Sequence, residues 1–226
     1  MLKAVLFDLD GTLANSDPLH FKIWQEILQK QGIEMDHAAY KAKISGRHNP
    51  EIIQAFFPDY SVEESEELAE FKEEEFRQRA TQLQPLTGVM DMINWVENQQ
   101  LKKAVVTNAP KKNAYFMLDA LKLTQRFPLV VLGEEMTVGK PDPECYQFCL
   151  QQLGVEPAEA IVFEDSPSGI RSAIAAGIET IGVASTHEPE ALKQLGVSLV
   201  IKDFTDKIMW QKLKRLNSQT ESNLTL

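Results

Sequence analysis

The chain has 226 residues, of which 43% are hydrophobic and 25% charged, and this composition excludes a disordered chain, a collagen or a continuous coiled coil. Lysine and arginine total 23 against 33 aspartates and glutamates, so the formal net charge is −10. Because phosphate contacts dominate nucleic-acid affinity, this acidic balance predicts no nucleic-acid partner.

The sequence also contains no run of 18 apolar residues, so we expect no membrane span. Aspartates interrupt its apolar start, which argues against a secretory signal. The two cysteines, Cys145 and Cys149, are too few for a disulfide scaffold. They predict buried free thiols, and hence a cytoplasmic or another reducing location.

Short apolar runs alternate with amphipathic stretches along most of the chain, which indicates a parallel sheet covered by helices. We predict an α/β fold, namely a Rossmann-like doubly wound parallel sheet. The predicted strands are Leu2–Phe7, Lys103–Val106, Leu129–Leu132, Ala160–Phe163, Thr180–Val183 and Ser198–Ile201. The predicted helices lie near 88–99, 110–121, 142–153, 168–176, 188–195 and 204–215.

Residues 15–82 break this alternation, because they show helical periodicity and no strand pattern. We therefore predict a small all-helical domain inserted after the first strand. The core domain would comprise 1–14 and 83–216, and 217–226 would form a disordered tail. The acidic run Glu63–Glu75 predicts a solvated helix face rather than an acidic binding patch.

The first candidate site residues are Asp8 and Asp10, at the end of the first predicted strand. Residues two apart on a strand point to the same side, and two neighbouring carboxylates repel unless a cation or proton lies between them. Oxygen ligands suit magnesium. The alternative is a strand-end turn at Asp10-Gly11.

Three later clusters follow other predicted strands. Thr107-Asn108 precede a helix and indicate either an anion site or an ordinary helix cap. Lys140, held between Gly139 and Pro141, could present a cation to a phosphate. Glu164 and Asp165 indicate metal ligands, with helix capping as the alternative.

Taken in order, DLDGT, TN, GKPDP and FEDSPSG resemble the four motifs of the haloacid dehalogenase (HAD) superfamily. The resemblance spans the chain apart from its tail, and the helical insertion stands where a C1-type cap would be. More narrowly, the chain resembles the β-phosphoglucomutase-like subfamily. The stretches SGRHNPEI, VTNAP and VFEDSPSGI are most similar to its sugar-phosphate phosphatases.

The resemblance implies a Mg²⁺-dependent phosphatase that acts through an aspartyl-phosphate. Asp8 would be the nucleophile, and Asp10 the general acid and base. The other implied roles are phosphate binding by Thr107, Asn108 and Lys140, and metal binding by Asp8, Asp10 and Asp165. Glu164 would be either a direct metal ligand or a residue that supports one. We expect a small phosphorylated substrate and a monomer.

The resemblance further implies that His20 and the cap residues Gly46, Arg47, His48 and Asn49 face the leaving group. The alternatives are that the cap loop is an ordinary solvent-exposed loop, and that His20 is only a partly buried helix residue. One rival function is a β-phosphoglucomutase, whose cap loop carries a lysine and an arginine where this chain has Ser45 and Asn49. The other rival is a catalytically idle protein that binds a metal or a partner.

Overall fold

Six parallel strands form one sheet at the centre of the molecule, as expected from the sequence. The computed structural model describes residues 1–45 and 47–218. The strand order is β3-β2-β1-β4-β5-β6, and every neighbouring pair is parallel. The strands are β1 (Ala4–Phe7), β2 (Lys102–Thr107), β3 (Val130–Leu132), β4 (Ala160–Glu164), β5 (Glu179–Val183) and β6 (Leu199–Ile201).

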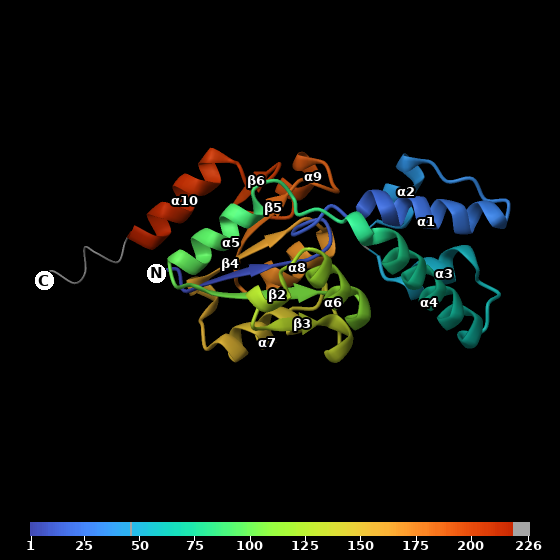
Figure 1. Cartoon of the computed structure of the whole chain (residues 1–226), viewed down its shortest axis with the longest axis horizontal. Coiled ribbons are helices and arrows are strands. Elements are labelled where there is room, and N and C mark those ends of the chain that lie inside the picture. Colours follow the sequence, from blue (N-terminus) through green and yellow to red (C-terminus); the bar gives the residue numbers. More distant parts are fainter. Residues whose placement is uncertain (46, 219–226) are drawn as a thin grey trace, which may run out of the picture.

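Helices lie over both faces of this sheet (Figure 1). The helices that follow the insertion are α5 (Val89–Asn98), α6 (Lys111–Ala120), α7 (Glu144–Leu153), α8 (Pro167–Ala175), α9 (Pro189–Lys193) and α10 (Lys207–Ser218). All six match the predicted helical stretches to within a few residues. Helix α10 extends through 217 and 218, which the sequence assigned to the tail, while 219–226 lie outside the described residues.

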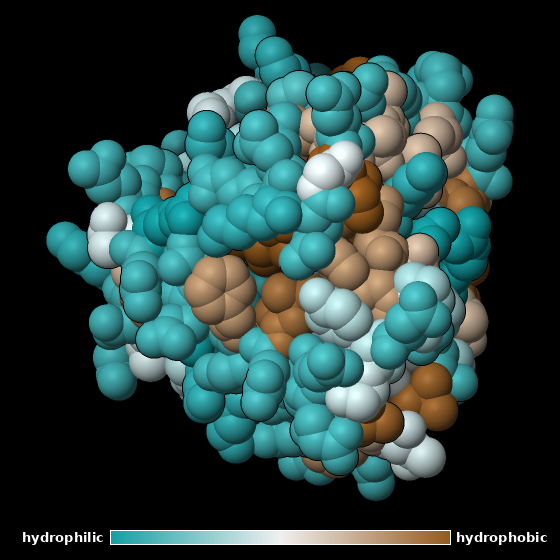
Figure 2. All heavy atoms as spheres, turned by 90° about the vertical axis from the view of Figure 1, so that its right-hand side faces the viewer, coloured by the Kyte–Doolittle hydropathy of each residue, from teal (hydrophilic) through white to brown (hydrophobic). Residues whose placement is uncertain are grey.

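The insertion after β1 is helical, as predicted. It contains α1 (Asp17–Lys30), α2 (His37–Lys43), α3 (Asn49–Phe56) and α4 (Val62–Arg79), and Figure 1 shows these four beyond one end of the sheet. Seen from that end, the surface is mainly hydrophilic, with hydrophobic side chains gathered near its centre (Figure 2). Among the described residues, no helix combines the length and apolarity that a membrane crossing would need.

Alternation along each strand divides the core between the two faces of the sheet. Phe7, Val105 and Phe163 belong to one hydrophobic cluster, which continues into α5, α6 and α10. Leu6 and Val162 belong to the other, which includes side chains of α7 and α8. Both cysteines are free and buried in this second cluster, as predicted.

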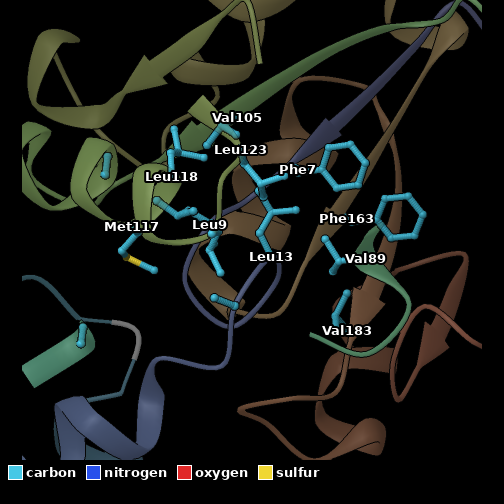
Figure 3. Packing of buried hydrophobic residues seen from close by; sticks show 14 of the residues in the cluster. Phe7, Leu9, Leu13, Val89, Val105, Met117, Leu118, Leu123, Phe163 and Val183 are labelled. Atoms are coloured by element: carbon cyan, nitrogen blue, oxygen red, sulfur yellow. The ribbon is translucent and has the colours of Figure 1, made fainter. Parts of the chain in front are cut away.

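An aromatic group lies on the first face, next to the strand ends (Figure 3). Phe7 stacks on Phe163 with ring centroids 5.5 Å apart, and Phe127 meets Phe7 edge-on at 5.8 Å. Phe204 packs against both Phe7 and Phe163. This packing fixes the ends of β1 and β4, from which the polar side chains of the next section project.

Phe7→Ala should destabilise the protein, because it leaves a cavity where the wild-type ring is fully buried. Such substitutions cost about 3–5 kcal/mol of unfolding free energy. The matched control is Val62→Ala, since Val62 is 70% exposed. Urea unfolding of both variants provides the measurement, and equal losses would contradict the role given to Phe7.

Candidate active site

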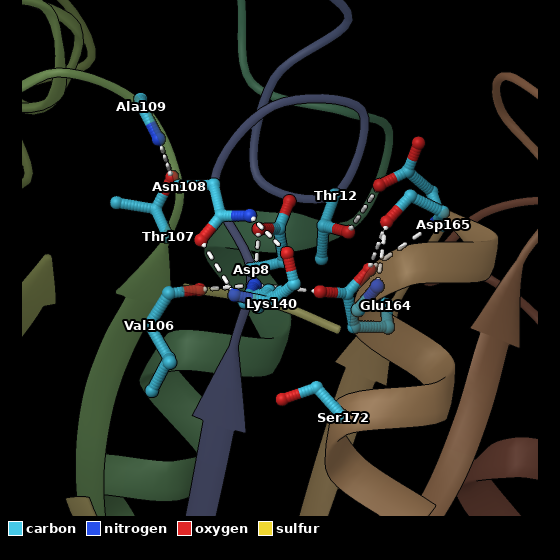
Figure 4. Close-up of polar contacts among 12 residues, drawn as sticks. Asp8, Thr12, Val106, Thr107, Asn108, Ala109, Lys140, Glu164, Asp165 and Ser172 are labelled. Atoms are coloured by element: carbon cyan, nitrogen blue, oxygen red, sulfur yellow. Dashed lines mark hydrogen bonds and ion pairs between the residues drawn. The ribbon is translucent and has the colours of Figure 1, made fainter. Parts of the chain in front are cut away.

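The carboxyl ends of β1, β2 and β4 meet around one buried lysine (Figure 4). The Nζ of Lys140 donates to Asp8 Oδ1 at 2.7 Å, to Glu164 Oε1 at 2.6 Å and to the Val106 carbonyl at 2.7 Å. Burial alone would lower the pKa of Lys140, but the carboxylates of Asp8 and Glu164 raise it above its ordinary value. The lysine is therefore a permanent cation beneath the site.

Three buried carboxylates surround this single cation. One oxygen from each of Asp8, Glu164 and Asp165 lies within 4.8 Å of the others. Burial, followed by the charge of Glu164, raises the pKa of Asp8 to about 8, although Lys140 opposes the shift. Burial and the charge of Asp8 likewise raise the pKa of Asp165. These carboxylates supply oxygen ligands and more negative charge than Lys140 balances. Both features fit a divalent hard cation such as Mg²⁺.

Glu164 and Asp165 are bonded differently within this acidic group. Glu164 accepts from Tyr146 at 3.2 Å as well as from Lys140, and its other oxygen accepts from Ser166. These bonds make Glu164 the residue that holds the lysine in place. Asp165 instead accepts only from hydroxyl groups among the side chains for which bonds are described, those of Thr12 and Thr186.

Asp10 points away from this acidic group and toward the helical insertion. Its Oδ1 accepts from Ser16 Oγ at 2.5 Å and lies 3.3 Å from His20 Nε2. The ammonium of Lys72 lies 2.9 Å from His20 Nδ1, so Nδ1 is the acceptor and Nε2 carries the proton that faces Asp10. Partial burial opposes the shift, but His20 and Ser16 hold the pKa of Asp10 below its usual value.

Thr107 and Asn108, the two residues at the end of β2 that are expected to bind phosphate, differ in how many hydrogen bonds their side chains already make. Thr107 accepts at Oγ1 from the backbone N–H of Ala109 at 3.0 Å. The amide of Asn108 accepts from the N–H of Lys140 and donates to its carbonyl, both at 3.0 Å. Asn108 Nδ2 also lies 2.9 Å from His48 Nε2. Asn108 therefore orients the Lys140 segment and contacts the helical insertion.

A cavity of about 550 Å³ lies between the strand ends and the insertion, and it contains all the core site residues except Glu164 in its lining. His20, Arg47, His48 and Asn49 line it from the side of the insertion. Gly46, the remaining cap prediction, lies outside the described residues. The structure thus brings together, around one cavity, predicted site residues as far apart in the sequence as Asp8 and Asp165.

Two residues of the cavity lining were missed from the sequence. Lys72 and Glu73 are buried in α4 and line the cavity, which corrects the expectation that Glu63–Glu75 is wholly a solvated face. The signal was present, because position 73 falls between Ala69 and Phe76 at the helical spacing of a buried stripe. The charge of the neighbouring glutamates concealed it.

The fold and the site together define a Rossmann-like α/β protein with a carboxylate-and-lysine crevice beneath a helical cap. The family model for the haloacid dehalogenase-like hydrolases matches residues 5–183. The chain belongs to this family, within its β-phosphoglucomutase-like subfamily, and is a phosphoric monoester hydrolase.

Several characterised relatives align over nearly the whole chain. The validoxylamine A 7'-phosphate phosphatase of Streptomyces hygroscopicus subsp. limoneus is 33% identical, covering 93% of this chain and 97% of the relative. The phosphorylated carbohydrates phosphatase of Thermotoga maritima is 32% identical, covering 89% and 94%. The β-phosphoglucomutase of Bacillus subtilis is 26% identical, covering 91% of each chain.

Among solved structures, a family IA, variant 3 HAD hydrolase from Entamoeba histolytica superposes with a TM-score of 0.86. It is 28% identical and covers 96% of this chain and all of that chain. The fold expected from the sequence is therefore confirmed by comparison as well as by topology.

The raised pKa of Asp8 predicts how metal-free protein responds to pH. Between about pH 4 and 8 the folded state holds a proton that the unfolded state has lost, so the free energy of unfolding should fall as pH rises. We would measure urea unfolding in EDTA from pH 6.5 to 8. His187, whose pKa burial lowers, contributes a slope of opposite sign that fades as pH rises above its ordinary pKa of 6.5, so the effect of Asp8 is read from the upper part of this range.

Added Mg²⁺ should stabilise the protein more at pH 8 than at pH 6.5, because the ligands must be ionised. Asp8→Asn is the matched control and should flatten the pH dependence. Metal-free protein that becomes more stable toward pH 8 would contradict the assigned electrostatics.

Proposed function

We propose that this enzyme is a Mg²⁺-dependent phosphatase that hydrolyses small phosphorylated metabolites, sugar phosphates above all, through an aspartyl-phosphate on Asp8. The observation that carries the proposal is the position of Asp8 at the cavity floor, bonded to the ammonium of Lys140 at 2.7 Å. A carboxylate and a phosphate dianion repel each other, and a fixed cation beneath the carboxylate reduces that repulsion.

The metal would be held by Asp8 and Asp165, with the backbone carbonyl of Asp10 as a further oxygen ligand. When bound, Mg²⁺ supplies positive charge that neutralises the transferring phosphoryl oxygens. Glu164 serves this site by fixing Lys140, since both of its oxygens are already bonded to protein donors. The burial of Asp8 beside Glu164, which raises the pKa of Asp8, supports this arrangement.

Asp10 is the proposed general acid and base. Its carboxylate lies at the cavity lining, and in its ionised form it can accept a proton from the water that attacks the phosphoenzyme. Asp10 then donates this proton to the leaving oxygen in the next turnover. Negative charge from a bound phosphoryl group raises the pKa of a neighbouring carboxyl, which helps Asp10 to retain that proton.

We assign phosphoryl binding to Thr107 and Asn108 at the end of β2. The hydroxyl of Thr107 can donate to a phosphoryl oxygen while it accepts from Ala109. Asn108 can present its amide by exchanging the contact with His48 for one with the phosphate. The leaving group would then meet Arg47 and His48, which line the opposite side of the cavity.

Two contacts favour a phosphatase over a mutase. A mutase must bind a second phosphate under the cap, and Ser45 and Asn49 occupy the positions of the cations that would do so. Here Ser45 donates to Asp17 at 3.3 Å, and Asn49 donates to Glu73 at 2.5 Å. Carboxylates beside both positions disfavour a second dianion. A catalytically idle protein would not account for the pairing of Asp8 with Lys140 at the cavity.

Asp8→Asn should reduce turnover to below about one per cent of wild type, because the amide is nearly isosteric but not nucleophilic. Phosphate release from p-nitrophenyl phosphate, with and without Mg²⁺, is the measurement. Wild-type protein that releases no phosphate under any condition would favour the idle protein. Retained activity in the variant would refute covalent catalysis at Asp8.

Arg47→Ala and His48→Ala should lower kcat/KM for sugar phosphates about ten- to a hundredfold, the cost of losing one hydrogen bond to a charged donor or acceptor. Phosphate release from p-nitrophenyl phosphate should change little, because its leaving group offers no hydroxyls. Equal losses for both substrate classes would contradict leaving-group recognition.

Glucose 1-phosphate in the presence of glucose 1,6-bisphosphate distinguishes the mutase. The phosphatase should yield free glucose and inorganic phosphate. Accumulation of glucose 6-phosphate, followed with a coupled dehydrogenase, would favour the mutase instead.

A further inference from the structure

Glu73 of α4 is a buried carboxylate with partners in three different segments. Its side chain belongs to a residue that is only 5% exposed. Oε1 accepts from Lys72 at 2.8 Å and from Asn49 at 2.5 Å, and Oε2 accepts from Asn113 Nδ2. A buried carboxylate is costly unless it is fully bonded, so these contacts define one strongly preferred arrangement.

Asn113 lies on the other side of the cavity, on α6, whose neighbouring Ala114 packs in the core of the sheet. It is 2% exposed, and both ends of its amide are bonded to α4. Nδ2 donates to Glu73, while Oδ1 accepts from Arg77 at 2.6 Å. Glu73 and Arg77 are four residues apart and therefore project from the same helix face.

Oε1 of Glu73 bonds to Asn49 and so extends these contacts to the cap residues above the cavity. Asn49 is the first residue of α3, and His48 immediately precedes that helix. His48 Nε2 in turn lies 2.9 Å from Asn108 Nδ2 at the end of β2. The contacts thus run from α6 through Glu73 and α3 back to the strand ends, and they enclose the cavity.

We propose that Glu73 and Asn113, with Arg77, form a clasp that positions the start of α3, and with it Arg47 and His48, over the leaving group. These are positioning residues, since they act through Asn49 rather than on the reacting atoms. The proposal rests on the phosphatase function and deepens it, because it names the contacts that make the enzyme selective for hydroxyl-bearing leaving groups.

The same two helices offer a matched control. Lys112 of α6 forms an ion pair with Glu70 of α4 at 3.0 Å, but the Lys112 side chain is 71% exposed. Exposed ion pairs contribute little, because solvent screens them. Lys112→Ala therefore removes a link between α4 and α6, while Glu70 keeps its bond to Arg77 and the bonds among Glu73, Asn113 and Arg77 remain.

Two single variants break the clasp by different means. Asn113→Asp places a carboxylate against Glu73. Glu73→Gln leaves a donor facing a donor in every orientation of the two amides, because Arg77, Lys72 and Asn49 also donate. In the double variant the new amide donates to the new carboxylate, Arg77 still has an acceptor, and the net charge is that of wild type.

The experiment compares kcat and KM for the best substrate among a panel of pentose and hexose phosphates with those for p-nitrophenyl phosphate. Each single variant should lose about tenfold or more in kcat/KM for the sugar phosphate, and much less for p-nitrophenyl phosphate. The double variant should return to within about threefold of wild type. Lys112→Ala should leave both substrates unchanged.

Urea unfolding of the wild type and the four variants shows whether each folds and whether the two clasp substitutions are coupled. The double variant should be less destabilised than the sum of the singles. Absent coupling, or single variants that keep wild-type selectivity, would overturn the clasp. A wild type that hydrolyses no sugar phosphate would overturn the proposed function, while the unfolding coupling would still report on the clasp.

Discussion

The buried ammonium of Lys140 is the interaction on which the site depends. Its cation lies between Asp8 and Glu164, where it offsets part of the cost of burying two carboxylates. Glu164 in turn needs space that Gly169 provides, since a Cβ there would lie 1.6 Å from Glu164 Oε1. The position of Glu164 beside Lys140 therefore requires glycine at position 169, near the start of α8.

A similar constraint acts at the turn after β1. Gly11 has a φ of +78°, and a Cβ at this position would lie 2.2 Å from Asp165 Oδ2. The DxDGT motif therefore combines two features, because its aspartates are the proposed nucleophile and acid–base group while its glycine allows the β1 and β4 ends to approach. Close approach concentrates negative charge, and that charge is what makes the crevice suited to a cation and then to a phosphate.

The sequence predicted the strands, the helical insertion and the residues at the strand ends because these depend on local periodicity and on the geometry of parallel sheets. It could not predict how the strand-end residues divide their work. The sequence did not show that the Asp10 side chain faces His20, or that Glu164 bonds to Lys140. Such distinctions depend on side-chain direction across segments distant in sequence.

The sequence could not predict the individual contacts between the cap and the core, which link the proposed leaving-group residues to the proposed nucleophile. Asn108 bonds both backbone groups of Lys140 and also contacts His48. His48 therefore contacts an amide that also orients the lysine beneath Asp8. Glu73 bonds to the first residue of the helix that follows His48, so hydrogen bonds connect the cap side of the cavity to the strand ends. Truncating the His48 side chain leaves both bonds between Asn108 and the Lys140 backbone in place, so selectivity for the leaving group can change while the lysine beneath Asp8 keeps its position.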